Sequence, residues 1–368
     1  MVDQYSCINC GKKHDITPTI WKCECGGVLD LVRDIPRINV SSWNYYPNSI
    51  WRYFESMAFA DNSKTWETTT MGEGQTPLIV LDSHEPNVFV KVEYMMPTLS
   101  FKDRGAAVLM TKAKELGVSK VIADSSGNAG TAIAAYAARC NIKCDIYLSE
   151  ETSPKKIAQV KAHGAMIKQI QGTREDIAAA AQKAVEEEKA FYASHVYNPF
   201  FYEGTKTYAY EIYEQLKEVP DSLIIPVGNG TLLLGAYLGF KELIENKLIE
   251  KMPKIIAIQA SNCAPLVKAF ENEEEKADPV SNKGTLAEGI AIAAPARSKQ
   301  ILEAVRKTNG LFIDIKEEEI LSARAKLAAK GFYVELTSAV NYAGYLKYER
   351  AAEEKIIIPL CGAGIKSK

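Results

Sequence analysis

The sequence predicts an α/β protein with two three-layer domains, in which helices cover both faces of mostly parallel sheets. Short apolar segments alternate with Ala-rich amphipathic segments over most of the chain, a pattern typical of β–α–β units. Small-residue turns follow several of the apolar segments, as expected where a strand ends and a helix begins. A cysteine-rich segment precedes this pattern and predicts a separate N-terminal knuckle.

Length and composition bound the class of protein. A chain of 368 residues is long for one core, which predicts two domains and a small appendage. The net charge of −2 argues against nucleic acid or an anionic membrane as a main partner. The N-terminus has no basic segment followed by an apolar one, and no apolar run approaches the roughly 18 residues of a membrane span. We therefore expect a cytoplasmic protein without a signal peptide.

The N-terminal residues 1–30 have the spacing of a zinc ribbon. Four of the eight cysteines lie here in two close pairs, each followed by glycine: Cys7, Cys10, Cys23 and Cys25. Four thiolates would complete a closed, structural zinc site. Only one residue separates the second pair, so His14 is an alternative ligand, and a knuckle of reduced thiols without metal is the alternative to zinc.

The remaining chain is taken in order of its apolar segments. We expect strands at 78–81, 88–92, 121–123, 143–148, 166–170, 223–227, 255–259, 311–314 and 356–360. We expect helices at 106–116, 131–138, 154–163 and 174–189, and after residue 231. Ligands of such parallel sheets bind at the carboxyl ends of the strands.

One lysine occupies a strand-to-helix junction. Lys102 stands in the segment P-T-L-S-F-K-D-R-G, after the 88–92 strand and before the Ala-rich helix. The helix N-terminus and a partly apolar surface both disfavour an ammonium ion, which is what an amine nucleophile needs. The alternative is an ordinary solvated lysine in a first helical turn.

Three small-residue turns strengthen the functional interpretation of Lys102. They are Ser125–Gly130, Gly228–Thr231 and Cys361–Gly364, each expected between a strand and a helix. Backbone N–H groups at such turns bind anions. The sequence G-N-G-T suits a phosphate, and S-S-G-N-A-G suits a carboxylate. An amine nucleophile, a phosphate cradle and a carboxylate loop together imply pyridoxal phosphate catalysis on an amino acid.

At these motifs the chain resembles the fold-type II pyridoxal-phosphate enzymes (tryptophan synthase β-like), and specifically the threonine synthases. The segments G-E-G-Q-T-P-L, S-F-K-D-R-G, S-S-G-N-A-G and P-V-G-N-G-T and the cysteine knuckles match in order. The resemblance implies a large cofactor-binding domain at 31–105 and 206–368 and a small α/β domain at 106–205. It also implies a homodimer.

The resemblance assigns roles residue by residue. Lys102 would bind the cofactor covalently and act as general acid and base. The other cofactor-binding residues would be Phe101, Asn128, Gly228, Asn229, Gly230, Thr231 and Cys361. The substrate carboxylate would be held by Ser125, Ser126, Gly127, Ala129 and Gly130. Cys361 would face the pyridine nitrogen, where threonine synthases usually carry threonine and serine dehydratases cysteine; a buried structural thiol is the alternative.

Two departures leave the reaction open. Phe201 stands where threonine synthases carry an arginine for the substrate phosphate, and an aromatic ring cannot replace a guanidinium there. Glu288 lies in A-E-G-I-A, which is similar to a segment of serine/threonine dehydratases, and we expect it near the substrate. We predict a lyase converting O-phosphohomoserine or a related substrate to threonine. The alternatives are a serine/threonine dehydratase and a β-replacement synthase.

A different class of function is a non-catalytic binding or regulatory protein, in which the zinc ribbon contacts a partner. The retained lysine and the intact turns argue against it, as does the small number of lysines near the ribbon. We therefore expect a small amino acid as the substrate, with no nucleic-acid or membrane partner.

Overall fold

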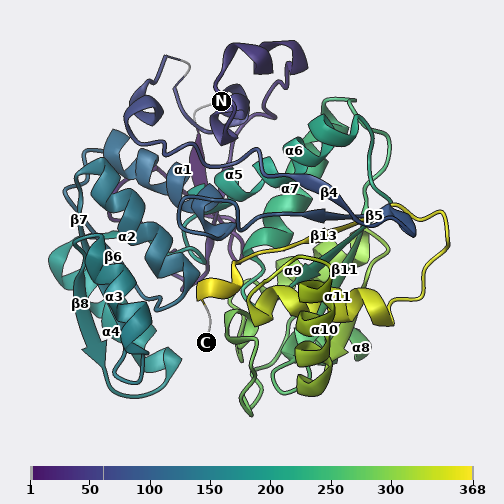
Figure 1. Ribbon diagram of the computed structural model, residues 1–368. Helices are drawn as coiled ribbons and strands as arrows, with labels where there is room; N and C mark the ends of the chain where they lie inside the picture. The colour runs from purple at the N-terminus through teal and green to yellow at the C-terminus, as the bar shows by residue number, and fades with distance from the viewer. Residues whose placement is uncertain (1–2, 61, 367–368) are drawn as a thin grey trace. The chain divides into compact units, whose positions relative to one another are not determined.

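The computed structural model describes residues 3–60 and 62–366, which divide into two compact units (Figure 1). The first unit contains the described residues up to Glu73 and Lys102–Gly204, and the second contains Gly74–Phe101 and those from Thr205 onward. Each unit contains a largely or wholly parallel sheet with helices, which confirms the α/β class. Among the described residues, every helix is too short or too polar to cross a membrane.

The first unit holds two sheets. Its strands are β1 (Gln4–Cys7), β2 (Lys13–His14), β3 (Leu29–Val32), β6 (Lys120–Ala123), β7 (Lys143–Ser149), β8 (Met166–Ile170) and β9 (Phe191–Tyr192). Its helices are α1 (Lys102–Glu115), α2 (Asn128–Cys140), α3 (Pro154–Ala162), α4 (Arg174–Glu188) and α5 (Phe200–Thr205), which ends at the boundary. The main sheet is parallel with the order β8-β7-β6-β9. Because parallel crossovers are right-handed, α2 and α3 cover one face and α4 the other.

The second unit is built on one larger sheet with the order β12-β11-β10-β13-β5-β4. Its strands are β4 (Leu78–Asp82), β5 (Glu85–Lys91), β10 (Ser222–Pro226), β11 (Lys254–Ala260), β12 (Leu311–Ile315) and β13 (Ile356–Pro359). Its helices are α6 (Thr207–Leu216), α7 (Thr231–Glu245), α8 (Pro265–Glu271), α9 (Ser298–Lys307), α10 (Glu317–Ala329) and α11 (Leu336–Lys347). Only β4 runs antiparallel to its neighbour, β5.

The core of the second unit follows from strand composition. Central strands of a parallel sheet are buried on both faces and so are continuously apolar. Ile356, Ile357 and Ile358 of β13 are all fully buried, and the apolar residues of β10 and β11 beside it are buried too. Every strand expected from the sequence is present, with shifted ends. The short strands β1, β2, β3 and β9 were not expected.

The segment before Glu73 lies with the first unit, although we expected residues 31–105 in the large domain. The buried Glu73 carboxylate accepts hydrogen bonds from Trp51 Nε1 at 2.6 Å and Tyr136 OH at 2.9 Å. Glu203 similarly accepts from the backbone N–H of Ala58 at 3.0 Å. Short 3₁₀ helices at Val40–Tyr45, Ile50–Ser56 and Thr65–Thr68 carry the aromatic residues of this segment. These bonds connect the segment to α2 and α5, which is why it lies with the first unit.

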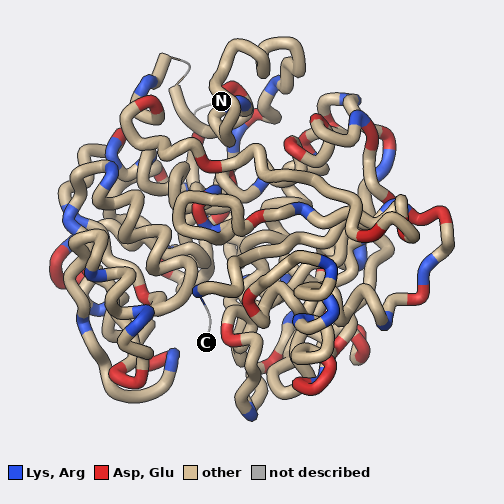
Figure 2. The backbone as a smooth tube through the Cα atoms, in the orientation of Figure 1, with Lys and Arg blue, Asp and Glu red and all other residues tan. Residues whose placement is uncertain are grey.

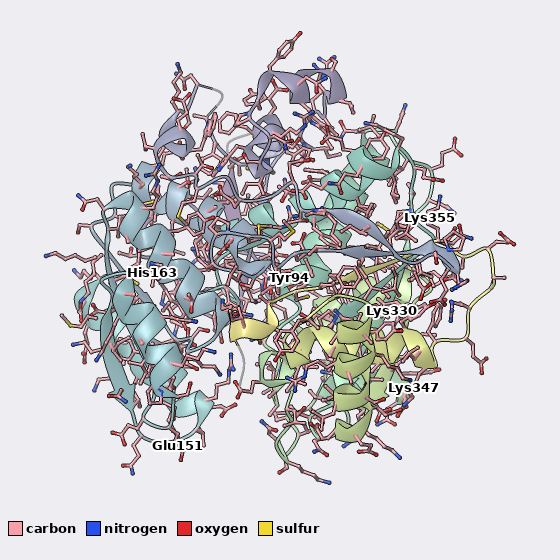
Figure 3. All side chains as sticks on the ribbon, viewed as in Figure 1. Tyr94, Glu151, His163, Lys330, Lys347 and Lys355 are labelled. Atoms are coloured by element: carbon pink, nitrogen blue, oxygen red, sulfur yellow. The ribbon has the colours of Figure 1, made fainter. Side chains whose placement is uncertain are left out.

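Charged residues are distributed over both units. Figure 2 shows Lys and Arg interspersed with Asp and Glu along the chain. In the second unit Lys330, at the end of α10, pairs with Asp82 at the end of β4, and Lys347 donates to the carbonyl of Asp314 at 2.9 Å (Figure 3). These contacts fasten helices α10 and α11 to strands of the sheet.

Candidate active site and metal centre

In the first unit two segments with polar residues, one of them predicted, follow neighbouring strands at a topological switch point. The chain leaves β6 toward β7 on one side, while β9 pairs with β6 on the other. Ligands of doubly wound sheets bind outside the carboxyl ends of strands at such a point. The Ser125–Gly130 turn follows β6, and His195 follows β9. Both therefore lie at the edge where a ligand is expected.

Lys102 is the first residue of α1, as the sequence predicted for a strand-to-helix junction. Its Nζ lies 5.7 Å from the centroid of the Phe201 ring, and Phe201 is completely buried. A Cβ added to Gly105 would come within 2.3 Å of that ring, so the glycine allows the ring to pack one turn after the lysine. The Lys102 amine thus has an apolar aromatic neighbour.

His195 is a second titratable group in this part of the unit, and sequence reasoning missed it. Its ring lies 5.9 Å from that of Phe201, edge to face. Burial lowers the pKa of His195 well below 6.5, and the positive charges of Lys102 and Arg174 lower it further. The imidazole is therefore neutral, so it adds no positive charge beside the Phe201 ring.

The Ser125–Gly130 turn is tight, and its glycines explain why. A Cβ on Gly130 would lie 1.7 Å from the carbonyl oxygen of Ser125, so only glycine permits this approach. The Ser125 hydroxyl accepts from the N–H of Gly127 at 3.4 Å. Asn128 is the first residue of α2, and Ser126 is half-buried in the turn. Of the predicted substrate residues, Ala129 is buried beside Gly130. The turn has the donors and the shape for a carboxylate.

The second unit has its own switch point between β10 and β13. β10 pairs with β11 on one side and with β13 on the other, and all three are parallel. The Gly228–Thr231 turn leaves the carboxyl end of β10, and Cys361 follows the end of β13. Two turns from adjacent strands therefore meet at one edge of the sheet.

The Gly228–Thr231 turn has the geometry of an anion cradle. A Cβ on Gly228 would lie 2.7 Å from Ile292 Cγ1 and 3.0 Å from the Cα of Ile290. Gly230 adopts φ +75° and precedes α7 without a side-chain cap. An uncapped helix N-terminus preceded by close-packed glycines suits a phosphate. Asn229 and Thr231 complete the turn.

The Glu288 segment supports this cradle from behind. Glu288–Ile290 forms a short 3₁₀ helix whose Gly289 N–H donates to the Thr337 hydroxyl at 3.1 Å. Ile290 of this helix, and Ile292 two residues beyond it, supply the nearest atoms that a Cβ on Gly228 would meet. Glu288 itself is exposed. The residue after it, Gly289, packs against the Gly228–Thr231 turn. The contact of Glu288 with substrate stays a prediction.

The Cys361 segment corrects one expectation. We expected a helix after Cys361–Gly364, but only the 3₁₀ turn Gly364–Lys366 follows within the described residues. Gly362 and Ala363 instead form isolated β-bridges with Ser100 and Val334. A Cβ on Gly362 would lie 2.3 Å from the Glu335 carboxylate, so the backbone of this segment packs closely against Glu335. This turn is no anion-binding helix N-terminus.

Buried polar atoms flank this segment. The N–H of Phe101 donates to the carbonyl of Cys361 at 3.0 Å, which places Phe101 beside the backbone of Cys361. Ser100 Oγ and Asn341 Oδ1 are both buried without a hydrogen-bond partner. Unsatisfied buried atoms are rare in native proteins and are explained where a bound group supplies the missing partner.

A buried ion pair fixes Gln75 and Thr76 of the G-E-G-Q-T-P-L segment, within the second unit. Lys91 Nζ donates to the Thr76 carbonyl at 2.6 Å and pairs with Glu211 at 2.8 Å, with both side chains fully buried. Glu211 also accepts from the N–H of Gln75 at 2.8 Å, where φ is +49°. A lysine inside the apolar run V-F-V-K-V is the signal that could have predicted this pair. Sequence reasoning did not use it.

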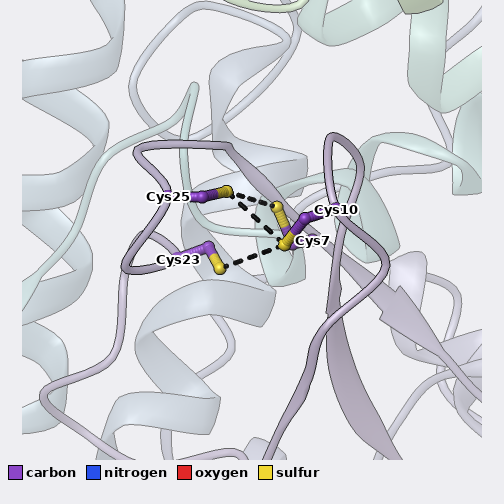
Figure 4. A group of neighbouring side chains, drawn as sticks. All are labelled: Cys7, Cys10, Cys23 and Cys25. Carbon is purple, nitrogen blue, oxygen red and sulfur yellow. Dashed lines mark hydrogen bonds between the residues drawn. The ribbon is translucent and has the colours of Figure 1, made fainter.

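The four N-terminal cysteines converge (Figure 4). Their sulfur atoms all lie within 4.8 Å of one another, with separations of 3.5 Å for Cys7–Cys25 and Cys10–Cys25 and 3.7 Å for Cys10–Cys23. Zn–S bonds of about 2.3 Å in a tetrahedron place sulfurs about 3.8 Å apart. His14 Nε2 lies 3.4 Å from Cys23 Sγ. The donor set fits zinc. Although only one residue lies between Cys23 and Cys25, both sulfur atoms belong to the group of four.

A known protein family matches most of this chain. The family model for "Pyridoxal-phosphate dependent enzyme" matches residues 69–362. The chain belongs to this family. The glycine cradle and the unsatisfied polar atoms near Cys361 fit the cofactor that the family uses, pyridoxal phosphate.

The related sequences are threonine synthases. The enzyme of Methanocaldococcus jannaschii is 37% identical over 376 aligned positions, covering 98% of this chain and 92% of its own. That of Methanosarcina acetivorans is 34% identical and covers 93% and 85%. The chain is thus a pyridoxal-phosphate-dependent lyase of threonine synthase-like type that acts on a small amino acid.

Solved structures share the fold. The processed form of threonine deaminase isoform 2 from Solanum lycopersicum has a TM-score of 0.68 at 24% identity, covering 82% of this chain and 81% of that one. Maize serine racemase has a TM-score of 0.69 at 22% identity, covering 79% and 88%. They confirm the fold-type II architecture expected from the sequence.

Proposed function

We propose that the chain converts O-phospho-L-homoserine and water to L-threonine and phosphate. The observation that carries this is the similarity to threonine synthases over almost the whole chain. In the reaction the phosphate leaves Cγ with the electrons of the C–O bond. Protons leave Cα and Cβ, the hydroxyl of water bonds to Cβ, and protons return to Cα and Cγ. Pyridoxal phosphate, when bound, withdraws electrons from Cα and so acidifies the neighbouring protons.

Lys102 has two tasks in this proposal. Its amine would hold the cofactor, and with substrate bound it would take the proton from Cα and return it. Its position at the start of α1 and the contact of its Nζ with the Phe201 ring support an amine that is partly shielded from solvent. Burial lowers the pKa of His195 and so makes it a weak base, which favours the Lys102 amine as the base in this part of the unit.

The remaining residues bind and orient. Gly228, Asn229, Gly230 and Thr231 would hold the cofactor phosphate, and Phe101, Asn128 and Cys361 its ring. The substrate carboxylate would bind at Ser125, Ser126, Gly127, Ala129 and Gly130. Glu288 would lie near the substrate. The tight turns at Gly130 and Gly228 support these roles, because both approach their neighbours more closely than any side chain allows.

A dehydratase is the second candidate, and Phe201 favours it. This buried ring occupies the place expected for a phosphate-binding arginine. A substrate without phosphate, such as L-threonine or L-serine, would not need that arginine. The enzyme would then release ammonia and a 2-oxo acid.

A substrate panel tests the proposal. Purified protein is given O-phospho-L-homoserine, L-threonine and L-serine, while threonine, phosphate and 2-oxo acid are measured, with Lys102→Ala as control. Threonine and phosphate formed in equal amounts support a threonine synthase. Formation of 2-oxo acid from threonine or serine alone would overturn it in favour of the dehydratase. Phe201 predicts a raised KM for the phosphorylated substrate.

Three further expectations belong to the proposal. A structural zinc ion binds Cys7, Cys10, Cys23 and Cys25, supported by the sulfur separations. The protein is a homodimer, which light scattering of the purified chain would test. It is located in the cytoplasm, which fractionation of its cells would test.

A further inference from the structure

The thiol of Cys361 lies beside a helix residue that sequence analysis did not single out. Asn341, on α11, directs its Nδ2 at the carbonyl oxygen of Pro359, 2.8 Å away. The same Nδ2 lies 4.0 Å from Cys361 Sγ, a long contact in which the sulfur accepts. Both side chains are buried, Asn341 completely and Cys361 to within 1%.

The carbonyl of Pro359 is an acceptor within reach of the thiol. Cys361 Sγ lies 3.8 Å from that oxygen. A thiol is a weak donor, whereas an amide N–H at 2.8 Å is a good one. Asn341 therefore makes the stronger bond to the carbonyl, and the S–H is held there only loosely.

The orientation of the Asn341 amide follows from its surroundings. Turning the amide over would place Oδ1 against the Pro359 oxygen, so that two acceptors face each other. In the orientation that avoids this, Oδ1 is buried without a partner. The amide thus gives up a hydrogen bond in order to donate toward the carbonyl and the sulfur.

Ser338 completes the arrangement from the same helix face. It lies one turn before Asn341, and its hydroxyl accepts from the N–H of Gly362 at 2.9 Å. Residues three apart on a helix share a face. Two polar side chains of α11 therefore hold the backbone on both sides of Cys361, and the Asn341 amide also approaches the sulfur.

We propose that Asn341 is a positioning residue that makes the sulfur of Cys361 an acceptor and so turns its S–H toward the pyridine nitrogen of the bound cofactor. The inference rests on the proposed role of Cys361. Without the amide, the thiol would donate to the freed carbonyl of Pro359 instead.

Infrared spectroscopy of the S–H stretch tests this, because that band lies apart from other protein absorption and moves to lower frequency as the thiol donates more strongly. Subtracting the spectrum of Cys361→Ala isolates the band from the other seven cysteines of the eight. Spectra are taken without and with pyridoxal phosphate. In the wild type the band is expected to move to lower frequency when the cofactor binds.

In Asn341→Leu the band is expected to lie low already without cofactor and to move by less than half the wild-type shift on binding. Cofactor affinity is expected to fall by about 2- to 10-fold, as for one neutral hydrogen bond. The control Asn246→Leu removes another asparagine–carbonyl hydrogen bond of 2.8 Å in this unit and should keep the full shift. Should Asn341→Leu fail to fold, Asn341→Ala removes the same donor without adding a branched side chain.

The outcomes separate the two proposals. A full shift in the folded Asn341 variants would overturn the role of Asn341 and leave that of Cys361 intact. A wild-type band that does not move with cofactor would overturn the role of Cys361, and the inference with it.

Discussion

Gly228→Ala is the sharpest structural perturbation of the proposed phosphate cradle. The added Cβ would lie 2.7 Å from Ile292 Cγ1 and 3.0 Å from Ile290 Cα, far inside ordinary contact. Ile292 is 5% exposed and Ile290 2%, so neither can move away freely. Overpacking of this kind costs about 1–3 kcal/mol, and the turn relieves it by moving away from the Glu288 segment.

That movement takes backbone donors away from the cofactor phosphate. A hydrogen bond to a charged group contributes about 1.5–3 kcal/mol, so losing one weakens cofactor binding by about 10- to 100-fold. Titration of the cofactor-free protein with pyridoxal phosphate, followed by absorbance, measures this. The control Gly127→Ala places its Cβ in open space and should keep cofactor affinity. Wild-type affinity in folded Gly228→Ala would refute the assignment of the turn.

Three other predictions follow from the first unit. Gly105→Ala should lower the free energy of unfolding in urea by about 1–3 kcal/mol because its Cβ meets the Phe201 ring, and Phe201→Leu in the same chain should restore part; an unchanged midpoint would contradict this packing. Wild-type protein should carry one zinc per chain by native mass spectrometry and Cys10→Ser none, with a lower Tm; metal-free wild type would be contrary evidence. Burial and nearby positive charge hold the pKa of His195 well below its usual 6.5, so only the unfolded chain binds a proton between those values. The free energy of unfolding should therefore fall as pH drops below 6.5, by at most about 1.4 kcal/mol per pH unit, and His195→Gln should lose this contribution. If urea unfolding gives the same difference in stability between wild type and His195→Gln at pH 5 as at pH 7, this reasoning is wrong.

The sequence predicted what depends on local pattern. Apolar runs such as residues 356–360 mark buried parallel strands, and the glycine turns at Gly130 and Gly228 follow strands as expected. The lysine junction was predicted for the same reason, since Lys102 stands between a strand and an Ala-rich run. These features are set by neighbours in the chain, so one sequence suffices to see them.

Features set by distant contacts were not predicted. Residues 31–73 join the first unit through Glu73 and Glu203, whose partners lie far away in the sequence. The turn after β13 forms β-bridges with Ser100 and Val334, which no local pattern reveals. Asn341 is one of several polar residues in α11, and its significance appears only when Pro359 and Cys361 are seen beside it.

The central claim is that Lys102 carries the cofactor, and borohydride trapping tests it most directly. Reduction of the cofactor-loaded protein makes the bond between lysine and cofactor permanent, and peptide mass spectrometry then locates it. We predict one labelled peptide per chain, with the added mass on Lys102, and no label in Lys102→Ala. Label on another lysine, or equal label in the variant, would contradict the account.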